Sequence, residues 1–291
     1  MATATTVVGL VLGSVAITAL SASRFIPTDP ERGVTTVATT VAIPAAARIV
    51  TITAKDFSFD GPDVIPAGLT EFRFVNQGPS LHHLSIIKLN GNKTVADLVQ
   101  ALSKPGPLPS WAKELGGPNA PAPGSNSNAT LKLEPGNYAL MCFVDLGGPP
   151  HFVKGMTRAL RVVPSKGASG SLPRADATIT LADYNFKLSS PLRAGKRTIR
   201  VHNVGGQHHE VELVQLAPGA NAGQFMTWLQ SMKGPPPGKA IGGIAGLESG
   251  LSESFSVDLT PGKYVLICFL PDAKDGKPHF VHGMMQEISV N

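Results

Sequence analysis

The sequence lacks any run of basic residues, although lysine and arginine outnumber the acidic residues and give a net charge of +5. A nucleic-acid groove needs its basic side chains gathered on one surface, and here they are spread along the chain. Nucleic acid is therefore excluded as a partner. The dispersed positive charge could steer acidic partners or an anionic surface toward the protein, or serve ordinary solubility.

Charge is also missing from the N-terminus. The first 23 residues contain no Asp, Glu, Lys or Arg, and Val7–Leu20 is almost wholly apolar or small. This stretch resembles the hydrophobic part of a secretory signal, with small residues at Ala19–Ser21 where cleavage could fall. Because no basic residue precedes it and it is nearly long enough to span a bilayer, an uncleaved anchor is the alternative. Residues 1–23 thus predict export, with a spacer over 24–47.

Export places the protein outside the cell, in a periplasm, or on the outer face of the cytoplasmic membrane, where an N-terminal membrane tether is possible.

Cysteine is scarce in the chain, with Cys142 and Cys268 as the only two. In an oxidising compartment these could form a disulfide. They occupy equivalent positions in two repeated segments, however, so we expect them in separate cores and unpaired.

The repeat is the main organising feature that the sequence does contain. Thr51–Phe59 aligns without a gap with Thr178–Phe186, and Pro135–Tyr138 aligns with Pro261–Tyr264. A period of this length is a whole domain, and each copy is long enough to bury its own core. We expect a first domain at 48–164, a Gly/Ser-rich linker at 165–173 and a second domain at 174–291.

Alternation of apolar and polar residues predicts β-strands in both copies. Glycine (31) and proline (25) are abundant enough for many turns between short strands. The clearest strands are Thr70–Val75, Tyr138–Phe143, Arg197–Val201 and Tyr264–Phe269.

One helical insert is expected in each copy, at Val95–Leu102 behind the N-cap Thr94 and at Gly223–Met232. Each insert lies between the first candidate histidine and the cysteine-bearing strand. The predicted fold class is all-β, with two tandem Greek-key β-sandwich domains that each carry a short helical insert.

Each copy contains four candidate metal ligands of the same types in the same order. A thiolate, two imidazoles and a thioether form the ligand set of a blue-copper centre, in which the Met is a weak axial ligand. None of the four supplies the carboxylate that calcium or magnesium prefers. Each Met taken alone could be a core filler. The candidate ligands are His82, Cys142, His151 and Met156 in the first copy and His209, Cys268, His279 and Met284 in the second.

The first histidine of each set has a histidine neighbour in the sequence, so the ligand of each pair has to be identified from the strand register. Side chains two residues apart share one face of a strand. From His209 that face continues through two apolar residues, whereas from His208 it would pass through two glutamates, an improbable core. We therefore expect His209 to be the ligand. The same offset from the preceding Asn-x-Gly selects His82 over His83, although the face of His83 is only somewhat less apolar.

With this ligand order the chain resembles the cupredoxin, or blue-copper, family over nearly all of residues 48–291. The resemblance is carried by the upstream histidine, the Gly-x-Tyr-x-x-x-Cys strand and the Cys…His-x4-Met loop. Eight residues separate Cys142 from His151, a loop similar to that of copper nitrite reductases. Ten separate Cys268 from His279, a departure from the commoner family spacings. The resemblance implies type 1 copper, cycling between Cu(I) and Cu(II), in one centre per domain.

A second departure concerns the residue directly after the first histidine ligand, which is often Asn in the family. Here His83 and Glu210 occupy these positions. The remaining histidines, His202, His208 and His282 together with His83, each admit a surface interpretation. A second metal site among them is the alternative.

Copper nitrite reductases and small laccases also have two tandem cupredoxin domains, so the resemblance admits an enzyme. Those enzymes need a further catalytic copper and have a histidine beside the cysteine ligand. Here Met141 and Phe143 flank the first cysteine, Ile267 and Phe269 flank the second, and no His-x-His pair occurs.

We therefore expect a one-electron carrier rather than an enzyme, with a redox protein donor and a redox protein acceptor as partners. The alternatives are a module that handles copper ions, a copper-free structural module that keeps the ligand residues, and a nitrite reductase or multicopper oxidase.

Overall fold

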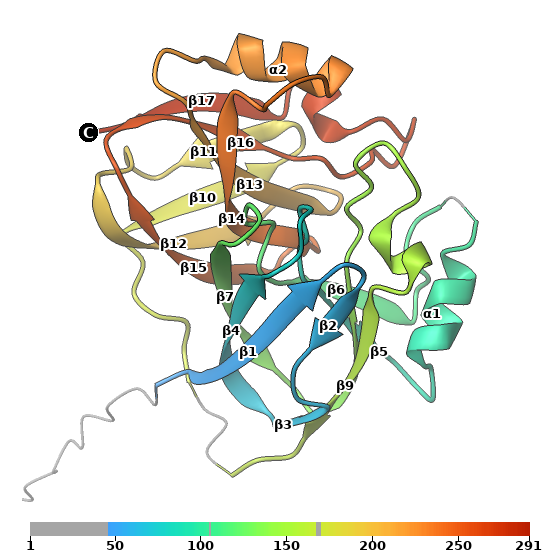
Figure 1. Cartoon of the computed structure of the whole chain (residues 1–291). Helices are drawn as coiled ribbons and strands as arrows, with labels where there is room; N and C mark the ends of the chain where they lie inside the picture. Colours follow the sequence, from blue (N-terminus) through green and yellow to red (C-terminus); the bar gives the residue numbers. More distant parts are fainter. Residues whose placement is uncertain (1–45, 105, 167–169) are drawn as a thin grey trace, which may run out of the picture. The chain divides into compact units, whose positions relative to one another are not determined.

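The structure is a computed structural model that describes residues 46–104, 106–166 and 170–291 (Figure 1). The predicted signal or anchor at 1–23 lies outside these residues, as do most of the spacer and part of the predicted linker. The described residues belong to one compact unit. Among them, no helix has the length and apolar character needed to cross a membrane.

The described chain is all-β with two short α-helices, as predicted, and the elements recur in the same order in both halves except for β3, which has no counterpart in the second half. The first half contains β1 (Arg48–Lys55), β2 (Ser58–Asp60), β3 (Val64–Pro66), β4 (Gly68–Asn76), β5 (Ser85–Leu89), α1 (Val95–Ala101), β6 (Ala112–Gly116), β7 (Asn126–Leu133), β8 (Gly136–Met141), the 3-10 helix η1 (His151–Lys154) and β9 (Thr157–Val163). The second half contains β10 (Ala177–Ala182), β11 (Asn185–Leu188), β12 (Gly195–Asn203), β13 (His209–Leu216), α2 (Ala222–Ser231), β14 (Gly238–Leu247), β15 (Ser252–Leu259), β16 (Gly262–Ile267), the 3-10 helix η2 (His279–His282) and β17 (Met285–Val290).

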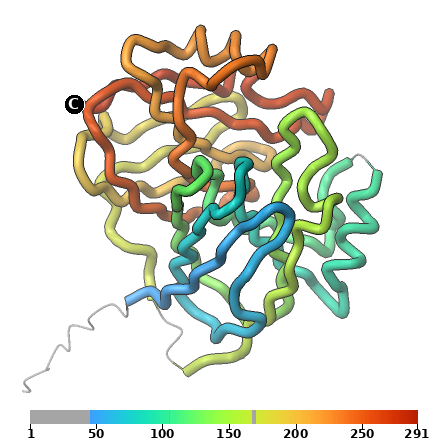
Figure 2. The backbone as a smooth tube through the Cα atoms, in the orientation of Figure 1, coloured from blue at the N-terminus to red at the C-terminus, as the bar shows by residue number. Residues whose placement is uncertain are grey.

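The strands form two sheets, and each sheet runs through both halves of the chain. One sheet has the order β11-β10-β12-β15-β7-β4-β1-β2 and the other β17-β16-β13-β14-β6-β5-β8-β9-β3. The halves meet where β15 pairs with β7, through Ser254 opposite Thr130, and where β14 pairs with β6, through Leu247 opposite Leu115. The path of the chain through this joint can be followed in Figure 2. Edge strands that would otherwise be unpaired are thereby joined, which two separate sandwiches would not provide.

Each half nevertheless has its own core beneath the strand that leads to its cysteine, since β8 ends at Met141 and β16 at Ile267, one residue before each cysteine. Tyr138 and Leu140 of β8 lie in the same core as Cys142, and β16 repeats this arrangement around Cys268 in the second core. Both cysteines are free and fully buried. The alternating pattern of these strands therefore turns each sulfur inward with the core side chains.

The two helices cover the opposite faces of the cysteine-bearing strands. Leu98 of α1 packs in a cluster with Met141 of β8, and Phe225 of α2 packs with Ile267 of β16. Both helices begin with a capping box, in which the side chain of Thr94 or Asn221 accepts a hydrogen bond from the backbone N–H of the third helical residue. In return, the backbone N–H of Thr94 or Asn221 donates to the side chain of that residue. Each helix thus packs against the face of β8 or β16 that points away from the core around the cysteine.

The joint between the halves buries four glutamates. Glu253 lies against Gly116, where an added Cβ would come within 2.6 Å of the carboxyl carbon, and Glu114 lies against Gly246 at 2.5 Å. Glycine leaves the space that each carboxyl group occupies. The buried glutamates are Glu114, Glu210, Glu212 and Glu253.

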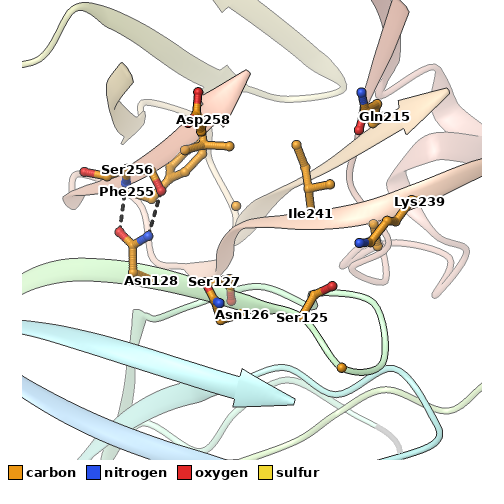
Figure 3. Close-up of a pocket in the computed structure, with 14 residues that line it drawn as sticks. Ser125, Asn126, Ser127, Asn128, Gln215, Lys239, Ile241, Phe255, Ser256 and Asp258 are labelled. Atoms are coloured by element: carbon orange, nitrogen blue, oxygen red, sulfur yellow. Dashed lines mark hydrogen bonds between the residues drawn. The ribbon is translucent and has the colours of Figure 1, made fainter. Parts of the chain in front are cut away.

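Asn128 of β7 also crosses the joint, at a distance from this cluster along the strand. Its side-chain amide donates to the carbonyl of Ser256 (2.6 Å) and its Oδ1 accepts from the N–H of the same residue (2.8 Å) (Figure 3). The side chain therefore continues the ladder of hydrogen bonds between β7 and β15. It lines a largely polar pocket together with residues of both halves.

Candidate metal centres

The first candidate centre brings His82, Cys142 and His151 together in the first core. Their ligand atoms lie within 4.8 Å of one another. The Nδ1 atoms of the two histidines are 3.0 Å apart, and the sulfur of Cys142 is 3.5 Å from Nδ1 of His151. Met156 is fully buried in the same core, and its carbonyl accepts from the N–H of Cys142 at 3.2 Å.

The second candidate centre repeats this geometry with His209, Cys268 and His279. The two Nδ1 atoms are 3.1 Å apart, and the sulfur of Cys268 is 3.3 Å from Nδ1 of His279. Met284 is fully buried, and its carbonyl accepts from Cys268 N–H at 3.2 Å. The longer loop between Cys268 and His279 therefore still returns the histidine to the sulfur.

The loop after each cysteine is closed by a 3-10 helix that begins at the second histidine. Gly155 and Gly283 end these helices with φ of 99° and 103°, a left-handed conformation that glycine adopts without strain. The N–H of the following Met then donates to the carbonyl of the histidine in both halves. This turn holds the His and the Met of each predicted ligand set close together.

Two aspartates that the sequence interpretation did not assign to the centres orient the first histidine of each. Asp56 Oδ1 lies 2.6 Å from Nε2 of His82, and Asp183 Oδ1 lies 2.8 Å from Nε2 of His209. A carboxylate in this position accepts the Nε2 proton, so Nδ1 presents its lone pair to the cluster. The signal was present in the sequence, because both aspartates fall in the aligned Thr51–Phe59 and Thr178–Phe186 segments.

The Asn-x-Gly sequence before each first histidine makes room for these pairs. A Cβ on Gly78 would lie 2.6 Å from Nε2 of His82, and one on Gly205 would lie 2.6 Å from Nε2 of His209. The N–H of each glycine donates to the preceding asparagine side chain, at 3.0 and 2.9 Å. Any larger residue would push the histidine away from its carboxylate.

The protonation states of the cluster fit a bound cation. Burial raises the pKa of Cys142 to about 12 and that of Cys268 well above its usual value, so neither thiol ionises by itself at neutral pH. Burial also lowers the pKa of the four histidines, that of His279 to about 4, which keeps their lone pairs free. A metal ion that binds thiolates and neutral imidazoles would replace the thiol proton.

Aromatic rings cover the second histidine of each centre. Phe57 packs edge-on against His151 with ring centroids 4.9 Å apart, and Tyr184 packs edge-on against His279 at 5.7 Å. Tyr184 also donates to Asp272 at 2.5 Å. The Nε2 atom of His279 is buried without a hydrogen-bond partner among the described residues. The surroundings of the two centres therefore differ more than their ligand atoms do.

His83 and Glu210, which stand where the resembled family often has Asn, hold the backbone beside each cysteine. Nε2 of His83 accepts from the N–H of Phe143 at 2.8 Å, and Oε1 of Glu210 accepts from the N–H of Phe269 at 2.9 Å. The N–H of Glu210 lies 3.4 Å from the sulfur of Cys268. Both residues therefore tie the strand of the first histidine to the strand of the cysteine.

The surface interpretation of His83 was wrong, since only 6% of this residue is exposed. Burial lowers its pKa to about 4, against the opposing effect of the Glu114 charge. The argument that selected His209 was also incomplete. It took a strand face with two glutamates to be an improbable core, but Glu210 and Glu212 are both buried. The joint with the first half covers that face of β13 and supplies hydrogen bonds that the sequence pattern does not reveal.

The other three histidines lie apart from one another. His202 bonds to Ser252 at 2.8 Å, His208 pairs with Glu114 at 3.2 Å, and His282 pairs with Asp275 at 3.1 Å. Asp272, Asp275 and His282 form a third group of possible ligands within the described residues. Asp272 already accepts hydrogen bonds from three neighbours, the side chains of Tyr184 and Gln207 and the backbone of Lys274.

No family model matches the chain, and no curated protein does. Solved structures similar to it include auracyanin A, a "blue" copper protein from Chloroflexus aurantiacus, at 21% identity over 40% of this chain and 100% of that one, with a TM-score of 0.31. A blue copper oxidase from Nitrosomonas europaea is 16% identical over 84% of this chain and 86% of that one, with a TM-score of 0.26.

A copper-containing nitrite reductase from Thermus scotoductus is 14% identical over 84% of this chain and 62% of that one, with a TM-score of 0.23. These TM-scores are low. These similarities therefore carry no argument about chemistry, and what the chain can bind depends on its own two clusters of buried histidine, cysteine and methionine.

Proposed function

We propose that this chain is an exported electron carrier that binds one type 1 copper ion in each half, with His82, Cys142, His151 and Met156 as one ligand set and His209, Cys268, His279 and Met284 as the other. When bound, copper would supply one-electron oxidation and reduction between Cu(I) and Cu(II). The single observation that carries the proposal is the twofold recurrence of two facing Nδ1 atoms beside a buried cysteine sulfur.

The residues around the clusters support a site that is arranged before the metal binds. Asp56 and Asp183 hold the first histidine of each cluster in the tautomer that a metal needs. The cysteine directly follows a core strand whose other face is covered by a helix. A rigid, buried ligand set changes shape little between oxidation states, which is what rapid electron transfer requires.

A carrier is favoured over an enzyme by the way the other histidines are used. An oxidase or nitrite reductase of the resembled family needs a further copper bound by additional histidines. His83, His202, His208 and His282 instead bond to separate partners in the described part of the chain. The donor and acceptor would be redox proteins, and the two domains would occupy 48–164 and 174–291.

The proposal is tested by copper analysis and visible spectroscopy of the full chain loaded with Cu(II). We expect close to two copper ions per chain and an intense thiolate-to-copper absorption band. Cys142→Ser and Cys268→Ser should each remove one copper ion and about half of the band, because the band requires the thiolate. Protein that takes up no copper and stays colourless would refute the proposal.

The same preparations separate a carrier from an enzyme. A carrier should not reduce oxygen or nitrite faster than free copper does, whereas steady turnover of either substrate would favour the enzyme. A module that handles copper ions would instead release its metal readily to a chelator and lack the intense band.

A further inference from the structure

A third group of possible metal ligands, in the second half, lies outside both buried clusters. One ligand atom each from Asp272, Asp275 and His282 lies within 4.8 Å of the other two. The ligands of a tetrahedral zinc ion lie about 3.4 Å apart at bond lengths of about 2.1 Å, so a small movement brings the three into binding distance. Asp272 is 4% exposed, but the side chains of Asp275 and His282 are 36% and 30% exposed. The group therefore opens to the surface.

Asp272 keeps an acceptor position for an ion. Its Oδ2 accepts from the hydroxyl of Tyr184 at 2.5 Å and from the side-chain amide of Gln207 at 2.9 Å. Its Oδ1 accepts from the N–H of Lys274 at 2.8 Å. A carboxylate offers about four lone-pair sites, so these three donors leave one for a metal ion. The same three hydrogen bonds hold the carboxylate in place before an ion arrives.

Asp275 and His282 are close enough to share a proton, which a metal ion can replace. Nε2 of His282 lies 3.1 Å from Oδ1 of Asp275, and this oxygen also accepts from the N–H of Lys277 at 2.9 Å. Oδ2 of Asp275 lies 3.5 Å from the ammonium group of Lys277, an exposed ion pair of the kind that contributes little free energy. An ion therefore competes here against one proton and one weak surface pair.

A buried nitrogen of the second candidate centre is directed at this group. His279 is fully buried, and its Nε2 has no hydrogen-bond partner among the described residues. Oδ2 of Asp272 is 3.8 Å away, too far for a hydrogen bond. A buried ring nitrogen without a partner is uncommon in a protein interior, so the polar surroundings of Asp272 are incomplete in the chain alone. An ion on this carboxylate, with its bound water, would complete them.

The first half repeats the backbone around this group but not its ligands. Lys154 stands where the second half has His282, and Phe57 stands where it has Tyr184. The ammonium group of Lys154 lies 4.5 Å from the ring centroid of Phe57, whereas the rings of His282 and Tyr184 lie 5.2 Å apart. The loop that carries the two aspartates is two residues longer than its counterpart. In the described part of the first half, no metal-ligand group forms around Lys154.

The ligand types decide which ion suits the group. Zinc binds histidine nitrogen together with aspartate oxygen, and zinc sites with three protein ligands keep a further position open. Calcium and magnesium prefer oxygen ligands alone. A redox copper centre uses thiolate or additional imidazoles, which this group lacks. One imidazole and two carboxylates therefore favour zinc.

We propose that Asp272, Asp275 and His282 form a zinc site beside the second candidate centre, with one coordination position left for an exchangeable ligand. The site uses none of the candidate copper ligands, so it does not depend on the proposed copper function. Zinc does not change its oxidation state, and no electron is transferred at this site.

The test titrates Zn²⁺ into the full chain carrying both Cys142→Ser and Cys268→Ser, which lacks the thiolates that would also attract zinc. Calorimetry measures the affinity, and NMR of the labelled protein locates the ion. We expect zinc to move the ring signals of His282 and the backbone amide signals of 272–277. Asp275→Asn should weaken this binding by at least about tenfold, since even a partner that only orients a ligand contributes about 10–100-fold to metal affinity.

Asp145→Asn is the matched control, because Asp145 is exposed in the equivalent loop of the first half and belongs to no group of metal ligands there. It should leave zinc affinity unchanged. His282→Lys places at this position the residue type of the first half and should abolish the binding. Both Asp275 and His282 are partly exposed, and the circular dichroism spectrum of each variant checks that it folds.

Zinc might instead occupy the paired histidines of the two buried clusters. Signals that move at His82 and His209 and not at His282 would overturn the proposal, and so would equal zinc affinities with and without Asp275→Asn. Because the protein without cysteines cannot form a type 1 copper centre, failure of this test does not touch the proposed copper function. Failure to take up copper in the unmodified protein likewise does not touch the zinc site.

Discussion

At the scale of single residues, the most informative side chains are those one step away from the candidate ligands. Asp56 and Asp183 decide which nitrogen of a histidine faces the cluster, although neither has the residue type of a blue-copper ligand. The sequence showed that both recur in the repeat but gave them no role, since only the folded chain brings β1 and β10 beside the first histidines. The ring of His82 lies beside that of His151, whereas the ring of His83 bonds to the backbone of Phe143. That His82 is the copper ligand stays a prediction.

Replacing Asp56 by Asn tests this orienting role. We expect Asp56→Asn to weaken copper binding at the first centre by about 10–100-fold, because a neutral amide no longer favours the Nε2-protonated tautomer of His82. The second centre should keep its affinity. The measurement is competition with a copper chelator, with each centre followed in a protein that lacks the other cysteine.

Asp63→Asn is the control for this substitution, since Asp63 pairs with Arg158 at the surface and does not contact the cluster. Asp183→Asn should produce the mirror result, with weaker binding at the second centre only. Equal affinities in the Asp56→Asn and unmodified proteins would show that the carboxylate does not orient the ring.

At the scale of strands and helices, the elements with a clear local pattern were predicted and those without one were not. The strands around Phe72 and Ile199 alternate cleanly, so their positions followed from the sequence. The N-cap Thr94 located α1, and apolar residues at helical spacing located α2, each to within one residue at either end. β14 contains a Gly-Gly pair, β6 ends at the first glycine of another, and both strands contain charged residues, a composition that does not predict a strand at all. These two strands form the joint in one of the two sheets, so the continuity of that sheet could not be predicted.

Gly246 in β14 gives the sharpest test of that joint. An added Cβ would lie 2.5 Å from the carboxyl group of Glu114, which is buried and fixed by Ser85 and His208. We expect Gly246→Ala to lower the free energy of unfolding by about 1–3 kcal/mol, the usual effect of overpacking. Urea unfolding of the copper-free protein measures it.

Gly148→Ala is the comparison, because an added Cβ there meets only the carbonyl of Asp145, at 3.6 Å. Alanine should fit and raise stability by about 0.4–1 kcal/mol through a less flexible unfolded chain. A Gly246→Ala protein as stable as the unmodified one would mean that Glu114 can move away freely.

At the scale of the whole molecule, the buried glutamates make the joint sensitive to pH. Burial raises the pKa of Glu253 well above its usual value, and one of its carboxylate oxygens has no hydrogen-bond partner among the described residues. The folded state therefore keeps a proton that the unfolded chain releases. The stability linked to this group is complete below the unfolded pKa of about 4.5 and is lost as pH rises toward the folded pKa.

Replacing Glu253 by Gln removes this titration. Between about pH 5 and about pH 7, we expect the unfolding free energy of the copper-free Glu253→Gln protein to fall less steeply than that of the unmodified protein, by about 1.4 kcal/mol per pH unit. Urea unfolding at several pH values gives the slope.

Glu134→Gln should leave the slope over this range unchanged. A hydrogen bond to Lys88 lowers the pKa of Glu134, so this carboxylate is ionised in both states above about pH 5. Identical slopes for Glu253→Gln and the unmodified protein would show that Glu253 keeps no proton in the folded state.

The glycine pairs of the joint also record how far the two copies have diverged. Gly116 in the first half accommodates the carboxyl group of Glu253 of the second, whereas the equivalent Gly242 of the second half has the side chain of Ser127 of the first half as its nearest neighbour. If one half paired in the same way with a second copy of itself, Gly116 would face a serine and leave the carboxyl space empty, or Gly242 would face a glutamate where a serine now fits. At these positions the duplicated segments are therefore complementary rather than interchangeable.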